Sequence, residues 1–285
     1  MARASSRLRQ LKNFTGLAAI TLLSILAILP LFHIIGTVAI NGLKAITRSG
    51  LDFLTKPPNP LNPSQPGGIA PVLKDSLLLV ILSSIIGIPL ALLTGVFISE
   101  FRSATISRLV FTLSLLLVEF PTILVGLYVY SVIVKPMGHY SLLAGAISLS
   151  LVMMPYVAVQ VSEALRNTPR DVREAAFSLG VSRTRVVYNI LLGAARKSII
   201  VGVLIGVAKI AGETAPLLFT AGGSFTSQTT CALKPGGAIP LMIYEYIQQP
   251  GEGYRILAWG ASLILLLVVF TIMIIAKILV KEVKL

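Results

Sequence analysis

The sequence predicts an all-α integral membrane protein with six transmembrane helices and with both termini in the cytoplasm. Hydrophobic residues make up 55% of the 285 residues and charged residues only 12%, and the mean hydropathy is +0.88. Soluble domains carry about 25% charged residues, and disordered chains combine low hydrophobicity with dense charge, so both classes are excluded. The other two observations behind this fold class are six long apolar stretches and an uneven distribution of the basic residues.

Six stretches are long enough to cross a bilayer, whose hydrocarbon core needs about 20 helical residues. The third is interrupted by Glu119, and the fifth contains Lys209 and Glu213. A secretory signal peptide is the alternative for the first stretch. That stretch is about twice the usual signal length and lacks a small-x-small cleavage site, which favours a retained helix. The expected spans are residues 13–43, 76–99, 109–134, 140–162, 198–221 and 256–279.

The basic residues predict the orientation of these spans. Of the 24 Lys and Arg residues, 16 lie near the two termini and in loops 100–108 and 163–197, whereas seven lie in the opposite loops. Because Lys and Arg accumulate on the cytoplasmic side, the net charge of +13 indicates membrane orientation rather than nucleic acid binding. The expected segments are a cytoplasmic N-terminus (1–12), the first span (13–43), an external loop (44–75), a core of five spans (76–280) with a second external loop (222–255), and a cytoplasmic tail (281–285).

Loop 163–197 predicts a helical hairpin on the cytoplasmic side. Thr168 and Pro169 are typical of a helix start, and Gly180 is typical of a helix end at which the chain reverses. Apolar residues recur between them at helical spacing, and Ser182 is placed to begin a second helix. The expected apolar stripe consists of Val172, Ala175, Ala176 and Leu179.

Two interpretations of this hairpin are compatible with its residues. It is either an amphipathic connector that rests on lipid headgroups, or a helical hairpin whose apolar surface inserts into a groove of a cytosolic partner. Ala175 and Ala176 favour the partner, because small side chains permit close approach.

Lys209 and Glu213 are the charged residues of the fifth span. Each intramembrane charge costs about 2.5–3.5 kcal/mol on insertion scales, so such residues are functional candidates. At a spacing of four they share one face of a helix. They form either a structural ion pair or part of a path for an anion. In the second case Glu213 can accept a hydrogen bond from hydrogen phosphate, whereas sulfate has no proton to donate.

The hairpin resembles the EAA loop of ABC-importer permeases. Glu174, Gly180, Ile190 and Leu192 have the spacing of that motif, although Gly193 stands where the motif has Pro. In that family the loop docks on the ATP-hydrolysing subunit. The resemblance therefore implies a type I ABC-importer permease fold. It also implies a coupling role for Arg173, Glu174, Ala175, Ala176, Leu179 and Gly180.

The ten residues from Gly212 to Ala221 resemble the fifth-span signature of phosphate-importer permeases of the PstA type. Residues 67–71 and 121–127 also agree with that family, and the resemblance covers about residues 65 to 280. It implies a substrate path at Lys209, Glu213 and Thr214. The chain departs from the family at Lys209, where Arg is usual, and after Pro155, where an Arg is often found.

The resemblance implies one permease subunit of an ATP-driven phosphate importer in the cytoplasmic membrane. Its implied partners are a PstC-type permease, a cytosolic ATPase dimer and an external phosphate-binding protein. The sequence has no phosphate-loop motif, so we expect no catalytic centre, metal or cofactor in this chain and ATP use by the partner. The alternatives are an importer for sulfate, molybdate or phosphonate, an ATP-independent channel or secondary transporter, and a scaffold that transports nothing.

Overall fold

The computed structural model describes residues 2–281, so residue 1 and residues 282–285 of the expected tail lie outside it. The described residues form helices and loops, and none of them forms a β-strand. Five helical segments are long and apolar enough to cross a membrane, and a bent pair of helices adds a sixth, which confirms the predicted fold class. Four of the continuous spans lie in α1 (Ala2–Ser49), α3 (Ala70–Glu100), α7 (Leu142–Arg166) and α12 (Glu252–Lys281). The fifth is the helical stretch Arg183–Ala211, which ends with α10 (Leu192–Ala211).

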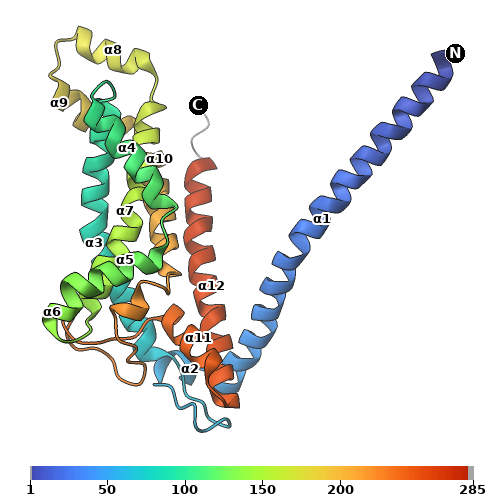
Figure 1. Ribbon diagram of the computed structural model, residues 1–285, viewed down its shortest axis with the longest axis vertical. Coiled ribbons are helices and arrows are strands. Elements are labelled where there is room, and N and C mark those ends of the chain that lie inside the picture. The colour runs from blue at the N-terminus through green and yellow to red at the C-terminus, as the bar shows by residue number, and fades with distance from the viewer. Residues whose placement is uncertain (1, 282–285) are drawn as a thin grey trace.

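The third span is bent rather than straight. Helix α4 (Thr105–Val118) ends just before Pro121, and the next helical segment, which begins with α5 (Thr122–Val129), leaves at an angle of 102°. Proline has no backbone N–H and restricts the residue before it, so a helix breaks at this point. The expected third span over 109–134 is therefore present as a broken helix. Figure 1 shows α4 running along the bundle and α5 running across it, toward π-helix η1 (Tyr130–Val134) and α6 (Lys135–Met137).

Helix α7 lies at the centre of the bundle and packs against α3, α10, α4 and α5. Its most apolar stretch is 72% buried, against 22% or less for the other spans. The surface of α3 that is buried carries a small residue at every fourth position, which lets two backbones approach closely in a membrane. These small buried residues are Ser83, Gly87, Ala91 and Gly95.

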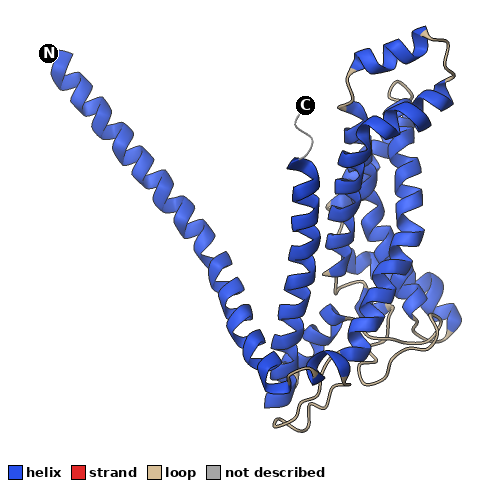
Figure 2. Ribbon diagram, turned by 180° about the vertical axis from the view of Figure 1, so that it is seen from behind, coloured by secondary structure: helices blue, strands red, loops and turns tan. Residues whose placement is uncertain are grey.

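Helix α1 leans away from the rest of the chain. Residues 13–34 are exposed on every side, and the helix packs near its C-terminal end against α12 and α2 (Asp52–Thr55). Figure 2 shows this divergence, with α1 and α12 meeting at one end and separating toward the other. In Figure 1 the separated ends of both helices point toward the end of the bundle that carries α8 and α9.

The opposite end of the bundle consists of the two loops expected to be external. These loops are not wholly irregular, because α2 lies in the first and α11 (Ile239–Gln248) in the second. Asp75, which is 1% exposed, fastens the second loop to α3. Its carboxylate accepts hydrogen bonds from Thr229 Oγ1 and from the Gly237 N–H, both at 3.0 Å. Asp75 is therefore a structural clamp between two distant segments.

We expect Asp75→Ala to lower the free energy of unfolding by about 3 kcal/mol, because it leaves buried donors of the second loop without an acceptor. Thermal unfolding of the purified protein and limited proteolysis between Gly222 and Gly237 measure the effect. Asp52→Ala is the matched control. Asp52 pairs with Lys56 on the surface, and such exposed pairs contribute at most about 1 kcal/mol. Equal effects of the two substitutions would contradict the clamp.

A crevice of about 510 Å³ lies at the same end, lined by Phe225, Glu245, Tyr246 and Tyr254 among others. The rings of Phe225 and Tyr246 meet edge to face at 5.4 Å. Burial raises the pKa of the Glu245 carboxyl above its ordinary value. Burial, together with Tyr254 and Glu245, raises the pKa of Tyr246 to about 12. The folded protein thus disfavours negative charge in this crevice.

This raised carboxyl pKa predicts a pH effect on stability. The folded state holds the Glu245 proton more tightly than the unfolded state does. Its contribution is therefore present below the ordinary carboxyl pKa and is lost as the pH rises through the raised value. We expect Glu245→Gln to raise the Tm at neutral pH and to flatten its dependence on pH. The exposed Glu163→Gln is the control, and the same flattening there would refute the assignment.

Candidate functional site

The charged pair of the fifth span lies where α10 ends. Lys209 Nζ is 2.5 Å from Glu213 Oε1, so the expected pair forms. However, α10 ends at Ala211 with Gly212 as its C-cap, and Glu213 lies in the turn that follows. A helical span to residue 221 is therefore wrong, and the pair does not share one helical face. Gly212 and Pro216 both disfavour a continuous helix here, and the chain goes on into the short 3₁₀ helix η3 (Leu217–Phe219).

Two residues from other spans complete this site, and sequence reasoning missed both. Thr122, the first residue of α5, donates a hydrogen bond from its hydroxyl to Glu213 Oε2 at 3.1 Å. The Tyr156 hydroxyl of α7 donates to the Val118 carbonyl at 2.8 Å, at the end of α4 where the span breaks. Lys209 Nζ lies 5.8 Å from the centre of the Tyr156 ring, within the range of a cation–π interaction. A threonine directly after a proline inside an apolar span was the available signal for Thr122.

The two charged groups differ in their access to the surface. The Glu213 side chain is 10% exposed and is held by Lys209 and Thr122, whereas the Lys209 side chain is 39% exposed. The ammonium is therefore the part of the pair that an anion can reach from outside the chain. The Thr214 carbonyl accepts hydrogen bonds from the N–H groups of Leu217 and Leu218, so Thr214 shapes the turn beside the pair.

Helix α5 packs directly on this turn. A Cβ added at Gly126 would lie 2.6 Å from the Cα of Pro216, so glycine is required for the close approach. We expect Gly126→Ala to lower the free energy of unfolding by about 1–3 kcal/mol, the usual cost of overpacking, as measured by thermal unfolding. Gly193→Ala is the control, because nothing lies within 4 Å of its added Cβ. A Gly126→Ala protein as stable as the control would contradict this packing.

The loop between α7 and α10 forms a hairpin of short helices. It consists of α8 (Arg170–Ser178), α9 (Arg183–Arg185) and π-helix η2 (Val186–Leu191). Gly180 reverses the chain with φ at +72°, a region that favours glycine. The expected capping by Thr168 is wrong. Pro169 occupies the N-cap, and the Thr168 hydroxyl points back to the Ala164 carbonyl at 3.5 Å.

The predicted coupling residues divide between two faces of this hairpin. Ala176 is 5% exposed and belongs to the main hydrophobic core. Leu179 is 82% exposed, and Val172 lies at the surface as well. Phe177, which sequence reasoning did not single out, is also exposed. Glu174 and Ala175 lie on the exposed face, so the hairpin presents an apolar tip edged by polar residues.

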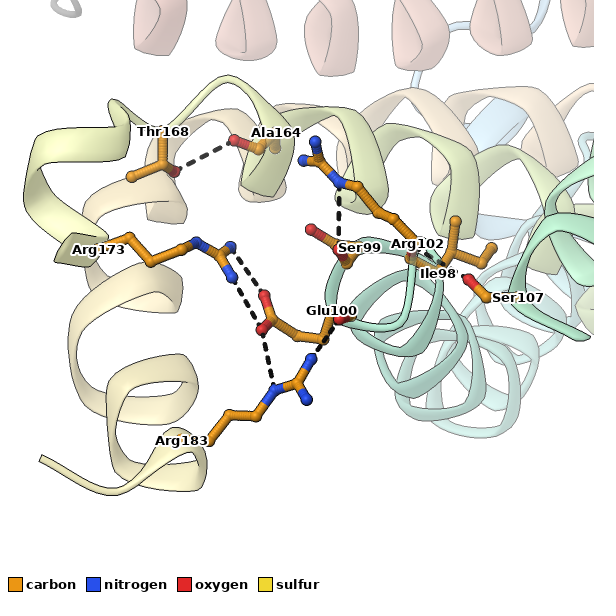
Figure 3. Close-up of polar contacts among 9 residues, drawn as sticks. All are labelled: Ile98, Ser99, Glu100, Arg102, Ser107, Ala164, Thr168, Arg173 and Arg183. Atoms are coloured by element: carbon orange, nitrogen blue, oxygen red, sulfur yellow. Dashed lines mark hydrogen bonds and ion pairs between the residues drawn. The ribbon is translucent and has the colours of Figure 1, made fainter. Parts of the chain in front are cut away.

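Glu100, at the end of α3, fastens the hairpin to the bundle. Arg173 donates two hydrogen bonds to its carboxylate, at 2.8 and 2.9 Å. Arg183 Nε lies 3.7 Å from the same carboxylate, and the Arg183 guanidinium stacks over Phe101 at 4.6 Å. Figure 3 shows both arginines converging on Glu100 from α8 and from the start of α9. The carboxylate is 3% exposed, so this is a nearly buried ion pair with bidentate geometry.

The hairpin and the charged pair are separate sites at the two ends of one helix. Helix α10 follows η2 directly and carries Lys209 in its last turn. Its 20 residues correspond to a length of about 30 Å at 1.5 Å per residue. One helix therefore connects the hairpin to the charged pair.

The comparisons with known proteins agree with this arrangement. Residues 87–285 match the family described as binding-protein-dependent transport system inner membrane component. The chain is 42% identical to the probable phosphate transport system permease protein PstA of Methanocaldococcus jannaschii, over 93% of this chain and 92% of that relative. The chain belongs to the PstA family of inner-membrane permeases. This permease is also 33% identical to the PstA protein of Pasteurella multocida, over 98% of both chains.

The fold of this permease has a counterpart among solved structures. A chain of the MetNI methionine ABC transporter, in an inward-facing crystal form, matches with a TM-score of 0.59. The match covers 76% of this permease and 95% of that chain at 18% identity, so it establishes the type I importer fold alone. Together with the six apolar spans, the family places this permease in the inner membrane as a multi-pass protein.

Proposed function

We propose that this chain is the permease subunit of an ATP-driven importer of inorganic phosphate. The observation that carries this proposal is its likeness to PstA proteins, which are named phosphate transport permeases, over more than nine tenths of the chain. The relatives are transport proteins, and we infer no chemical transformation of the substrate by this chain.

The substrate path passes the Lys209–Glu213 pair. Hydrogen phosphate carries both charged oxygens, which attract an ammonium group, and a P–OH group, which donates a hydrogen bond. Lys209 supplies the ammonium, and the Glu213 carboxylate supplies the acceptor while Thr122 holds it in place. Sulfate has no proton to donate at neutral pH, and the carboxylate would repel it. The pair therefore favours phosphate over sulfate.

The hairpin couples this path to ATP hydrolysis in a partner. Its apolar tip, with Val172, Phe177 and Leu179 exposed, suits insertion into a groove of a cytosolic ATPase subunit. The Arg173–Glu100 pair then passes the movement to α3, and η2 passes it to α10. The sixteen basic residues near the hairpin and the termini support a cytoplasmic location of this end, because Lys and Arg accumulate on that side.

The complete importer contains further subunits. We assign a PstC-type permease to the surface on which Lys209 is accessible, so that the path lies between two permeases. A cytosolic ATPase dimer binds and hydrolyses ATP, and this chain binds no cofactor of its own. An external phosphate-binding protein delivers the substrate to the end that carries α2 and α11.

Transport by the reconstituted complex tests this function. The four kinds of subunit are assembled in proteoliposomes, and the uptake of radiolabelled phosphate and sulfate is measured with and without ATP. We expect phosphate uptake that depends on both ATP and the ATPase, and little sulfate uptake. Equal uptake of sulfate would favour a general oxyanion importer, and uptake without ATP would favour a channel or secondary transporter.

A further inference from the structure

A polar cavity of about 450 Å³ lies beside the hairpin, apart from the charged pair. Its walls come from the end of α3, the turn after it, the end of α7 and the start of α8. Figure 3 shows the guanidinium groups of Arg102 and Arg173 reaching into the region between α3 and α8. The polar lining that matters here consists of Ser99, Glu100, Arg102, Arg166, Thr168 and Arg173.

Two buried polar atoms at this cavity have no hydrogen-bond partner within residues 2–281. One is Oγ of Ser99, a residue that is 3% exposed, and the other is Nε of Arg166. A buried donor that stays without an acceptor destabilises the folded state. The hydroxyl and the guanidinium N–H both donate, so an acceptor in the cavity would satisfy both.

The charges of the lining favour an anion as this acceptor. Three arginines (Arg102, Arg166 and Arg173) and two carboxylates (Glu100 and Glu174) line the cavity. The Glu100 carboxylate is already neutralised by Arg173 and Arg183. A cation would therefore find only the Glu174 carboxylate at this cavity, whereas an anion would find the two unsatisfied donors of Ser99 and Arg166.

We propose that this cavity binds a phosphate group. A tetrahedral phosphate has several charged oxygens, which match the planar fork of arginine and accept hydrogen bonds from hydroxyls as well. The cavity opens at the end of the spans, where two sources of this chemistry are present: the headgroup of an anionic phospholipid and inorganic phosphate in the cytosol. The cytoplasmic location rests on the proposed orientation, but the binding itself does not.

A bound phosphate would connect three elements of the coupling apparatus. Ser99 lies in the last turn of α3 and Arg102 in the turn after it, Arg166 ends α7, and Arg173 belongs to α8. Occupancy would hold the hairpin against the bundle and so would modulate the transmission of movement from the ATPase. The site is therefore regulatory and does not belong to the substrate path.

Binding to the assembled complex tests this site in a Lys209→Ala background, which removes the substrate path from the measurement. Inorganic phosphate is titrated calorimetrically, and retention of phosphatidylglycerol against phosphatidylcholine is followed by native mass spectrometry. The test variants are Arg102→Gln with Arg166→Gln, and Ser99→Ala as the milder change. Arg108→Gln is the matched control, because Arg108 is exposed at the same end and does not line the cavity.

We expect the double variant to lose roughly tenfold or more in affinity and Ser99→Ala to lose roughly threefold, with the control unchanged. An effect on phosphatidylglycerol alone identifies a lipid site, and an effect on inorganic phosphate identifies a site for the free ion. Unchanged affinity for both ligands in both variants overturns the proposal. Because the measurement involves no transport, a failure of the proposed phosphate import would appear separately, in the uptake experiment.

Discussion

Lys209→Ala will reduce ATP-dependent phosphate uptake by about 100-fold or more while the complex still assembles. The substitution removes the ammonium that attracts the anion, and it leaves the Glu213 carboxylate, which is 10% exposed, with Thr122 as its remaining partner. An uncompensated buried charge costs about 3–5 kcal/mol, and each 1.4 kcal/mol corresponds to about a factor of ten. Uptake by proteoliposomes measures the effect, and size-exclusion chromatography verifies assembly.

Lys209→Arg is the matched control, because it keeps the positive charge and restores the residue usual in the family. We expect it to retain most of the uptake, since guanidinium can bind oxyanions through two parallel hydrogen bonds. Glu213→Gln complements the pair of substitutions by removing the negative charge, so sulfate should then compete better with phosphate. Wild-type uptake by Lys209→Ala would show that the pair is only structural.

Glu100→Gln will uncouple ATP hydrolysis from transport. Arg173 and Arg183 both bind this carboxylate, which is 3% exposed, and the loss of one partner of such a buried pair costs about 3–5 kcal/mol. The hairpin then loses its attachment to α3. We expect uptake to fall roughly tenfold or more while the ATPase subunit continues to hydrolyse ATP.

Simultaneous assays of uptake and ATP hydrolysis measure this uncoupling. A double-mutant cycle with Arg173→Gln assigns it to the ion pair, because the second substitution should add little to the first. Arg173→Lys keeps the charge but loses the bidentate geometry, so an intermediate effect is expected. Fully additive effects of Glu100→Gln and Arg173→Gln would show that the two residues act independently.

The sequence was sufficient to predict the number of spans and the pairing of Lys209 with Glu213. A membrane helix satisfies its backbone hydrogen bonds within its own segment. A span can therefore be recognised from the hydropathy of about 20 consecutive residues, without knowledge of its neighbours. The pair is also local, since its members are four residues apart.

The remaining features depend on contacts between distant residues. In the sequence, Glu100 and Asp75 are recognisable only as the charged residues that bound an apolar stretch. Their hydrogen-bond partners, Arg173 and Thr229, lie 73 and 154 residues away along the chain. Thr122 is likewise 91 residues from Glu213. The spacing of residues within one segment cannot predict contacts with such distant residues. Pro121, Gly212 and Pro216 are local reasons for the breaks, but the angle of 102° at the first break describes how two helices lie relative to each other.

The π-helix η2 fixes the direction in which Lys209 points. A π-helical turn contains one residue more than an α-helical turn, and each residue of an α-helix turns the chain by about 100°. Without the widened turn over Val186–Leu191, the far end of α10 would be rotated by roughly that angle relative to the hairpin. The direction of the Lys209 ammonium group, and with it the side of the bundle from which an anion can reach it, therefore depends on a turn that lies about 30 Å away.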